Sequence, residues 1–222
     1  VGQDAATYTG NPNLKAEVNN QFEVGISGYE NFEDSPINAV YFEASVYYSD
    51  LQNYISAKLD PTLGENAKRY HNIKDAYKTG VDASVKVDFA TDFYAKADVA
   101  YIYAKNKDWN ESLPLIPPLT TGFTLGFDNH KFWANANLNL VSKQSKISPS
   151  FGELETKGYE TLDIRVGVRP IEDLSVGFAG LNIFNKTYHD HLNFAFRNQG
   201  DISMLPINEA GRNFTAFVQY QF

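Results

Sequence analysis

The side chains best suited to metal binding lie near the C-terminal end of the sequence, in the polar segment 188–210. His189 and His191 flank Asp190 there, and Met204 follows further along. Imidazole nitrogens suit copper and zinc, and a thioether sulfur favours Cu(I). Two histidines two residues apart point the same way on a strand, whereas a loop leaves their geometry open. We therefore expect His189, His191 and Met204 as metal ligands; the alternative is that they are solvated or order the loop.

Apolar and polar residues alternate along most of the chain, and this pattern predicts β-strands. Between residues 81 and 89, for example, Val81 and Val85 alternate with the charged Asp82 and Lys86. Strict alternation with charge on one side only is typical of a strand whose faces meet two different solvents. About nine such segments occur, and most approach the ~9–11 residues that a tilted membrane strand needs.

The connections between these segments alternate in length. Short turns are expected at 31–36, 90–92, 128–130 and 170–173. Long polar segments are expected near 58–78, 105–118, 143–158 and 188–210. Short turns on one rim and long loops on the other are typical of an outer-membrane barrel. The sequence therefore predicts an all-β fold, a transmembrane antiparallel β-barrel, and a secreted β-sandwich is the alternative.

Tyrosines near the expected strand ends favour the membrane barrel, because aromatic residues form girdles at the lipid–water boundary. We assign to such a girdle Tyr47, Tyr48, Tyr54, Tyr101, Tyr103 and Tyr159. On the opposite face of the strands, charged residues are expected to line a wet lumen and to pair with one another. These residues are Glu43, Asp82, Lys86, Lys96, Asp98, Asp163 and Arg165.

Composition excludes several other classes of protein. The 222 residues contain no run of the ~20 apolar residues that a membrane helix requires. The absence of Cys excludes disulfides and thiolate metal sites, and a net charge of -8 without a basic run argues against nucleic acid as a partner. No serine lies in a nucleophile elbow and no glycine-rich phosphate loop occurs, so we expect neither an enzyme nor a resident cofactor.

The strand count predicts that residues 1–222 are only part of a barrel. Single-chain bacterial barrels have an even number of strands, and nine would leave two unpaired edges in lipid. The chain begins at Val1 without an initiator Met or a secretory signal. We therefore expect residues 1–222 to be the C-terminal portion of a larger barrel, with the earlier strands in a missing N-terminal segment.

Four short motifs resemble elements of one known family, and they occur in the family's order. Residues 10–17 read GNPNLKAE, residues 80–83 read GVDA, residues 181–188 read LNIFNKTY and residues 211–222 read GRNFTAFVQYQF. Together they resemble the TonB-dependent outer-membrane receptors. Ala16 stands where the family usually has Pro. The ordered set spans almost the whole chain.

The resemblance implies that the chain forms the last nine strands of a plugged barrel of roughly 22 strands. It also implies a plug and an energy-coupling box in the missing N-terminal region, uptake of a scarce substrate, and location in the bacterial outer membrane. The lumen charges would then also contact the plug. The implied partners are outer-membrane lipid and lipopolysaccharide, the TonB complex through the missing region, the remaining barrel and plug, and the barrel assembly machinery through the last strand, which ends at Phe222.

The segments YHDHLN at 188–193 and NEAGR at 208–212 are similar to the copper receptors of this family and, more loosely, to its zinc receptors. The sequence IPP at 116–118 also occurs in that branch. The resemblance implies a copper or zinc ion, or a complex of one, as the cargo. A siderophore (ferric chelate) receptor of the same family and a passive porin or surface-binding barrel are the alternatives.

Overall fold

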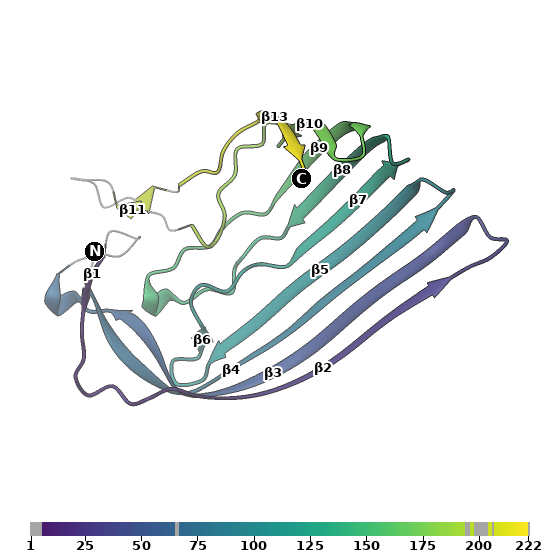
Figure 1. The fold of residues 1–222 in the computed structure, drawn as a ribbon. Helices are drawn as coiled ribbons and strands as arrows, with labels where there is room; N and C mark the ends of the chain where they lie inside the picture. Colours follow the sequence, from purple (N-terminus) through teal and green to yellow (C-terminus); the bar gives the residue numbers. More distant parts are fainter. Residues whose placement is uncertain (1–5, 65–66, 194–195, 198–203, 206, 222) are drawn as a thin grey trace.

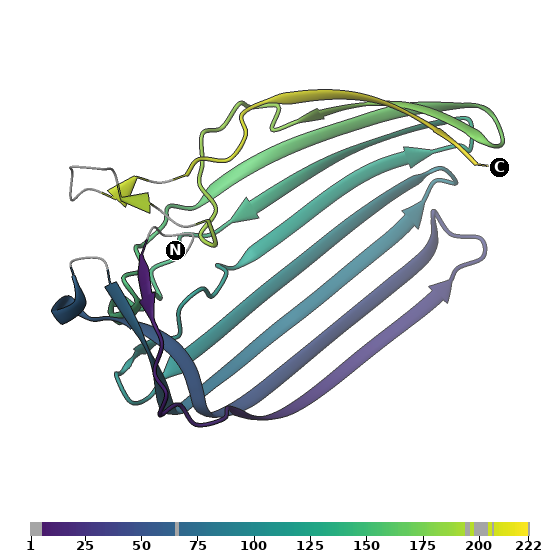
Figure 2. The same ribbon diagram turned by 60° about the vertical axis from the view of Figure 1, so that its left-hand side comes forward.

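One antiparallel sheet makes up most of the structure (Figures 1 and 2). The computed structural model describes residues 6–64, 67–193, 196–197, 204–205 and 207–221. Its principal strands, in their order across the sheet, are β2 (Val18–Asn31), β3 (Ile37–Leu59), β4 (Ala67–Phe89), β5 (Phe93–Asn106), β7 (Thr120–Asp128), β8 (Phe132–Val141), β9 (Tyr159–Ile171), β10 (Leu174–Leu181) and β13 (Asn213–Tyr220). Nine principal strands in the described residues confirm the number that the alternation predicts.

The remaining elements are short and lie outside this path. They are β1 (Thr7–Thr9), β6 (Glu111–Ser112), β11 (Phe196–Arg197), β12 (Met204–Leu205) and the 3-10 turns η1 (Pro61–Leu63) and η2 (Pro149–Phe151). β1 pairs in parallel with the start of β4, β6 pairs with the end of β5, and β11 pairs with β12. None of the helices in the described part of the chain is both long and apolar enough to cross a membrane.

The register keeps apolar residues in continuous rows on the outer face of the sheet. One such row crosses six strands through Phe42, Val85, Ala97, Phe123, Leu138 and Leu162. Large side chains on this face stand free, with 70% of both Phe22 and Val218 exposed. A soluble protein rarely exposes so wide an apolar surface. This face therefore has the character of a lipid-facing barrel wall.

The inner face carries polar rows in the same register. Ser27, Glu43, Ser84, Asp98, Gly122 and Asn139 face one another across six strands. All seven charged residues assigned to the lumen from the sequence lie on this face. Three of its ion pairs join residues two apart on one strand: Lys86–Asp88 at 2.7 Å, Lys96–Asp98 at 3.7 Å and Asp163–Arg165 at 3.5 Å. The predicted division into an apolar and a polar face is confirmed.

The two rims differ as the sequence predicts. Short reversals near 32–36, 90–92, 129–131 and 172–173 lie together on one rim, and the long connections lie on the other (Figure 2). One predicted long segment is wrong. Most of 58–78 is strand, because β3 and β4 each run for 23 residues and only the tip near η1 connects them. Polar residues on both faces hide this extension from a test that looks for apolar alternation.

The predicted tyrosine girdle is only half right. Tyr48, Tyr101 and Tyr103 lie in outer rows, and Tyr48 and Tyr103 both contact Tyr77 on β4. The register places Tyr47 on the inner face, where its ring covers Gly80. Tyr54 and Tyr159 also turn inward: Tyr54 packs beside Leu51 and Ile73, and 8% of Tyr159 is exposed. Adjacent strand residues point to opposite faces, so Tyr47 and Tyr48 cannot both meet lipid.

The two edge strands of the sheet, β2 and β13, are exposed along both faces. Each pairs with one neighbour among the described residues, β2 with β3 and β13 with β10. Unpaired backbone groups in lipid are expensive, which is why membrane sheets close into barrels. The described sheet is therefore a segment of a larger barrel.

Candidate functional site: three joined loops at one rim

Three connections meet at the rim that carries the long segments. We name them loop A (107–118, between β5 and β7), loop B (142–158, between β8 and β9) and loop C (182–212, between β10 and β13). Loop A contains β6, loop B contains η2, and loop C contains β11 and β12. All the metal ligands predicted from the sequence lie in loop C.

Loop A folds onto the inner face of the sheet. Its residues Leu113 and Ile116, 0% and 7% exposed, pack against Leu51, Ala76 and Ala104, which belong to the inner rows of β3, β4 and β5. This cluster is the main apolar core of the described residues. Burial of these apolar side chains holds loop A against the inner face. The loop therefore partly closes the space enclosed by the curved sheet at this rim.

Loop B turns sharply at Ser148 and is bonded to loop A there. The Ser148 hydroxyl accepts from the backbone N–H of Phe151 and starts η2, as a capping serine does. The same hydroxyl donates to Glu111 Oε1 of loop A at 2.8 Å. A second bond runs from Gln144 Nε2 to the carbonyl oxygen of Ile116 at 2.9 Å. Loops A and B are therefore held together by buried polar contacts.

The carboxylate of Glu153 accepts hydrogen bonds from all three loops. Oε1 accepts from the backbone N–H of Leu115 in loop A at 2.8 Å, and Oε2 accepts from the N–H of Ser148 in loop B at 2.8 Å. Oε1 also lies 3.0 Å from His191 Nε2 of loop C. Only 6% of the Glu153 side chain and 1% of the His191 side chain is exposed. Removing any one partner would leave a buried polar group unsatisfied.

His191 has partners for both ring nitrogens. Nδ1 lies 3.0 Å from the hydroxyl of Thr156 and Nε2 faces Glu153. The imidazole therefore fills a polar slot in loop B rather than facing an open space. One neighbour, Asp190, caps the turn of loop C by accepting from the N–H of Leu192 at 2.8 Å, and it also accepts from the hydroxyl of Tyr159 at 3.2 Å.

Among the described residues, neither of the other two predicted ligands has a recorded polar contact with this slot. His189 is half-buried, and Met204 is described only by its backbone, which pairs with Arg197 in the β11–β12 hairpin. Among the described residues, no three His, Asp or Glu side chains gather closely enough to hold a metal ion. The prediction that His189, His191 and Met204 share a metal ion remains a prediction.

The LNIFNKTY motif forms the base of loop C. Asn182 adopts a left-handed backbone conformation with φ 49°, and its side chain bonds both the N–H and the carbonyl of Lys186 at 2.8 Å. Its amide also donates to the carbonyl of Ala210 at 3.3 Å, which brings the two ends of loop C together. Further along, Tyr188 stacks on Tyr159 at 4.1 Å between ring centroids, and burial raises the pKa of its phenol. The motif therefore positions loop C on the wall.

The GNPNLK motif clamps the N-terminal segment against the upper part of β4. Asn11 donates to the carbonyl of Tyr70 at 3.0 Å, and Asn72 both accepts from the N–H of Lys15 at 2.7 Å and donates to its carbonyl at 2.9 Å. The segment thereby reaches the same rim as loops A, B and C.

A cavity of about 570 Å³ opens between the β3–β4 tip and loops A and B. Most of its lining residues are aromatic or apolar in type, but polar groups make up at least as much of the exposed lining: Tyr8, Tyr54, Ser56, Tyr70, Phe151, Lys78, Pro114, Leu115 and Ile116 are among these residues. Above it, the buried Lys68 ammonium lies 3.8 Å from the centroid of Phe151. Aromatic walls with a few polar groups are usual in small-molecule sites.

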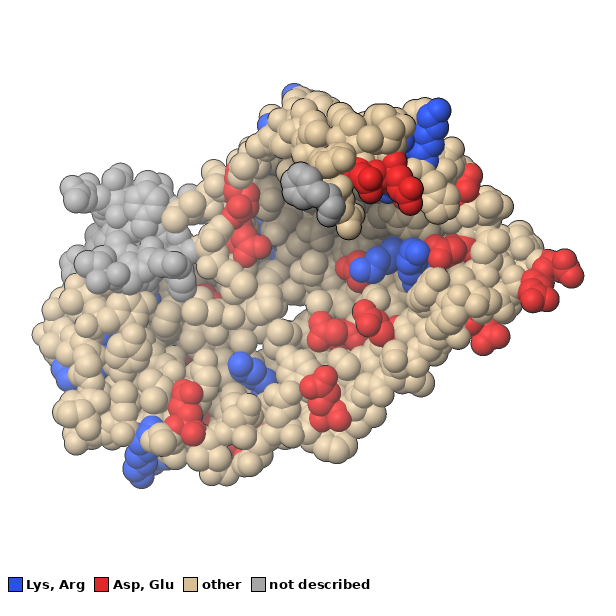
Figure 3. Space-filling model, in the orientation of Figure 1, with Lys and Arg blue, Asp and Glu red and all other residues tan. Residues whose placement is uncertain are grey.

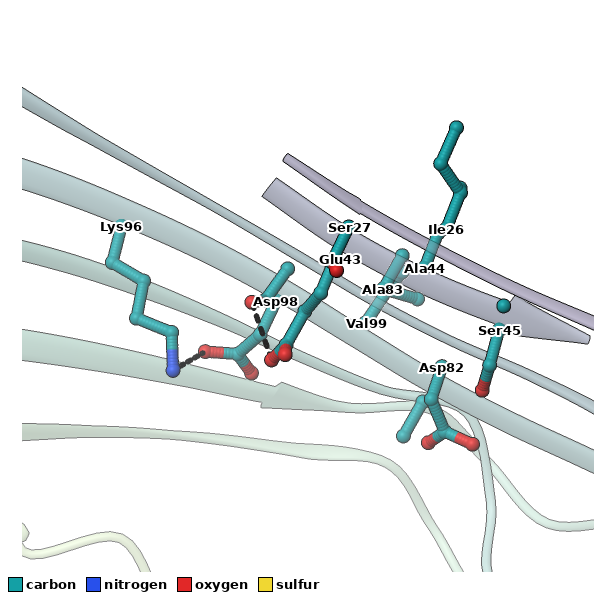
Figure 4. Close-up of a pocket in the computed structure, with 13 residues that line it drawn as sticks. Ile26, Ser27, Glu43, Ala44, Ser45, Asp82, Ala83, Lys96, Asp98 and Val99 are labelled. Carbon is teal, nitrogen blue, oxygen red and sulfur yellow. Dashed lines mark hydrogen bonds and ion pairs between the residues drawn. The ribbon is translucent and has the colours of Figure 1, made fainter. Parts of the chain in front are cut away.

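A second hollow, lined by several charged side chains, lies on the inner face of β2–β5 (Figure 4). It measures about 530 Å³ and is lined by Glu43, Asp82, Lys96 and Asp98, all pointing to the same side, while Ile26 points away. Acidic and basic groups gather within the curve of the wall (Figure 3). The inner face is therefore built to contact water or a polar body.

Sequence reasoning missed Glu153, Thr156 and Glu111. The partners of Glu153 in loops A and C lie 38 residues away on either side, so no local pattern shows the network. One local signal exists: Ser148 followed by Pro149 is a typical start of a helical turn. It predicts the turn but not its contacts.

A curved antiparallel sheet with an apolar exterior, a polar hollow and loops sorted to one rim is the wall of an outer-membrane type β-barrel. The chain belongs to the family described as TonB dependent receptor-like, beta-barrel, whose profile matches residues 1–183. No curated protein matches the chain.

Several solved structures share the fold. The copper transporter OprC superposes with a TM-score of 0.83 at 22% identity, over 96% of this chain and 34% of that one. The ferric enterobactin receptor PfeA of Pseudomonas aeruginosa, in complex with BCV-L6, gives 0.71 at 19% identity, over 100% of this chain and 34% of that one. The siderophore receptor PirA of Acinetobacter baumannii gives 0.66 at 20% identity, over 97% and 33%. The chain spans about a third of the length of each.

Proposed function

We propose that this chain forms wall and loops of a bacterial outer-membrane receptor that imports a scarce substrate with energy supplied through the TonB complex. The observation that carries the proposal is the barrel wall whose mouth is partly closed by loop A, packed onto the inner face. Energy coupling would act through the N-terminal region and plug, and the plug would contact the polar inner face.

The outer face fits the partners of such a receptor. Rows of exposed apolar residues match the hydrocarbon of outer-membrane lipid, and the charged long-loop rim suits the headgroups of lipopolysaccharide. β13, an edge strand of the described sheet, presents alternate apolar residues for pairing with another strand, which supports recognition by the barrel assembly machinery.

The cargo that we propose is a copper ion or a copper complex, with zinc as the related choice. Support comes from the sequence of loop C, from the ligand chemistry of His189, His191 and Met204, and from the shared fold of the copper transporter OprC. Metal at His191 would have to replace Thr156 or Glu153, because both ring nitrogens have protein partners. His189 and Met204 are therefore the ligands whose replacement tests the cargo most cleanly.

The test uses the full-length receptor. Copper and zinc binding would be measured by calorimetry, and metal-dependent growth would be followed in cells that rely on this receptor. Replacing both His189 and Met204 by Ala should lower copper affinity at least roughly tenfold, since each lost ligand removes a metal–protein bond. His71→Ala, on β4 beside Trp109, is the matched control and should leave affinity unchanged. Unchanged affinity in the double variant would exclude His189 and Met204 as ligands, and absence of copper binding by the unmodified receptor would contradict the copper assignment.

A siderophore is the second candidate, and the cavity beneath the β3–β4 tip favours it. Aromatic rings and Lys78 suit an anionic chelate with ring systems, and about 570 Å³ accommodates a small organic molecule. Ferric chelates that protect the receptor against thermal unfolding, with no effect from copper, would select this candidate. A passive porin is distinguished by conductance, because a plugged receptor should show little steady open current.

A further inference from the structure

Four tyrosines gather on the outer face of β3, β4 and β5, on the side of the long-loop rim. Tyr77 is the central ring, and its centroid lies 5.8 Å from that of Tyr48 and 5.9 Å from that of Tyr103. On β5, Tyr101 and Tyr103 occupy the outer positions that follow Val99. Because tyrosines collect where hydrocarbon meets headgroups, these rings mark the boundary of the apolar band at this rim.

Lysine side chains from two loops lie over these rings. The Lys146 ammonium of loop B is 4.8 Å from the ring centroid of Tyr103 and 5.2 Å from that of Tyr101, and it donates a hydrogen bond to the Tyr101 hydroxyl. The Lys107 ammonium of loop A is 5.5 Å from the centroid of Tyr77. The tyrosines are therefore bordered by cations on the side of the long loops, as at the headgroup level of a membrane.

The charges in this group are not balanced. Lys107 pairs with Asp75 at 2.9 Å. Lys105 stands directly opposite the central ring in the register, and Asp50 stands opposite the same ring on its other side. In the described part of the chain, neither Lys105 nor Lys146 forms an ion pair with a carboxylate. Two ammonium groups therefore remain available to an anion from outside the protein.

The short-turn rim presents different chemistry. On β4, β5 and the adjacent β7, the aromatic residues at that rim are Phe89, Phe93 and Phe127, whose rings are in contact and carry no hydroxyl group. Lys131 lies there over Phe132, at 5.6 Å from the ring centroid. Neighbouring strands thus offer tyrosine hydroxyls with several ammonium groups to one leaflet and phenylalanine rings to the other.

We propose that Lys105 and Lys146, together with Tyr101 and Tyr103, form a binding site for the phosphate groups of lipopolysaccharide in the outer leaflet. Ammonium groups at headgroup level attract anionic lipid, and their apolar stems lie along the rings. Hydroxyls at the same level suit a sugar headgroup, because they donate and accept hydrogen bonds. This inference rests on the outer-membrane location in the proposed function, and it concerns the surrounding lipid rather than the cargo.

The full-length receptor in detergent tests the site with two lipid probes, bisphosphorylated lipid A and the phospholipid phosphatidylglycerol. Native mass spectrometry measures the lipid retained by the receptor across a titration. Combined Lys105→Gln and Lys146→Gln should weaken lipid A binding about tenfold or more, because two cations beside the phosphates are lost. Lys131→Gln at the other rim is the matched control and should retain lipid A like the unmodified receptor.

Unchanged lipid A affinity in the double variant would refute the site, and so would an unmodified receptor that retains no lipid A. An equal loss of phosphatidylglycerol affinity would reveal an unselective anionic surface and overturn the assignment to lipopolysaccharide. Circular dichroism and the thermal midpoint in lipid-free detergent check the folding of the double variant, and Lys105→Gln alone serves if it does not fold. Because lipid retention is measured without cargo, failure of the proposed transport function would leave this result unaffected.

Discussion

The wall and the loop network are built on opposite principles. Each strand of the wall repeats the same two-residue pattern, and each residue meets partners fixed by the register, such as Phe42 opposite Val85. In the loops, Glu153 and His191 depend on single contacts between segments far apart in the sequence. The wall therefore tolerates a change at one position if the face keeps its character, whereas the network depends on particular groups.

The largest expected effect comes from placing a charge on the lipid face of the wall. Val85→Arg would put a guanidinium near the middle of the apolar band, at a cost of about 2–4 kcal/mol. Ser84→Arg, on the adjacent position, faces the wet interior beside Glu43 and should cost much less. Denaturant unfolding of the full-length receptor in lipid vesicles measures both. An equal loss of unfolding free energy in the two variants would contradict the assignment of one face to lipid and the other to water.

The second-largest effect is expected from a substitution at the base of loop C. Asn182→Ala removes three side-chain hydrogen bonds to Lys186 and Ala210 and puts alanine, which tolerates the left-handed region less well than Asn, at φ 49°, so we expect local destabilisation of about 2–3 kcal/mol. Asn182→Gly loses the same hydrogen bonds, but glycine adopts a positive φ without steric cost. It should therefore be less destabilising than Asn182→Ala. Limited proteolysis of loop C reads out both variants. If Asn182→Ala also makes the wall strands more sensitive to proteolysis, the stability of loop C is not independent of the stability of the wall.

Within the wall, the next effect is expected where an aromatic ring covers a glycine. A β-carbon at Gly167 would lie 2.3 Å from the Trp133 ring, which also stacks on Phe217, so Gly167→Ala should cost about 1–2 kcal/mol. Gly25→Ala is the control, because its nearest contact would be an ordinary 3.6 Å and its effect should be near zero or stabilising. The thermal midpoint of the full-length receptor distinguishes them, and identical midpoints would contradict the ring-over-glycine packing.

The smallest effect concerns pH at the β3–β4 tip. Hydrogen bonds from Thr62 and then Arg69 hold the pKa of Asp60 below its ordinary value. A carboxyl whose folded pKa is lowered stabilises the tip above the unfolded value of about 3.9, and that stability is lost as pH falls through the lowered folded pKa. Proteolysis near η1 should therefore stay slow at neutral pH and rise below about pH 4. Arg69→Ala should move this rise to higher pH, and an unmoved profile would exclude the pairing.

Much of the wall could be predicted from the sequence because its structure depends on local alternation. The faces of β4 follow directly from Val81, Asp82 and their neighbours, and so do the short turns. The polar extension of β3 and β4 beyond the membrane band was missed, since backbone pairing continues there without apolar contrast. The tyrosine girdle was assigned by position along the strand, and only the register separates Tyr47 from Tyr48.

The candidate site was far less predictable. The composition of loop C indicates residues that can bind metal, but it does not show that His191 is enclosed by Thr156 and Glu153. Those contacts arise when three separate loops pack on the same inner surface. The residue pattern within one segment carries no information about contacts between distant loops. The burial of Glu153 between loops A, B and C is therefore seen only in the structure.

Everything rests on the wall having one face in hydrocarbon and the other in water, and cysteine labelling tests this most directly. The chain has no cysteine of its own, so single Cys variants at Phe42, Val85 and Val218 report on the outer face, with Ser84 and Thr124 on the inner face. In the full-length receptor in membranes, a lipid-soluble reagent should label the outer set and a small water-soluble reagent the inner set. Equal labelling of both sets by the water-soluble reagent would contradict the account.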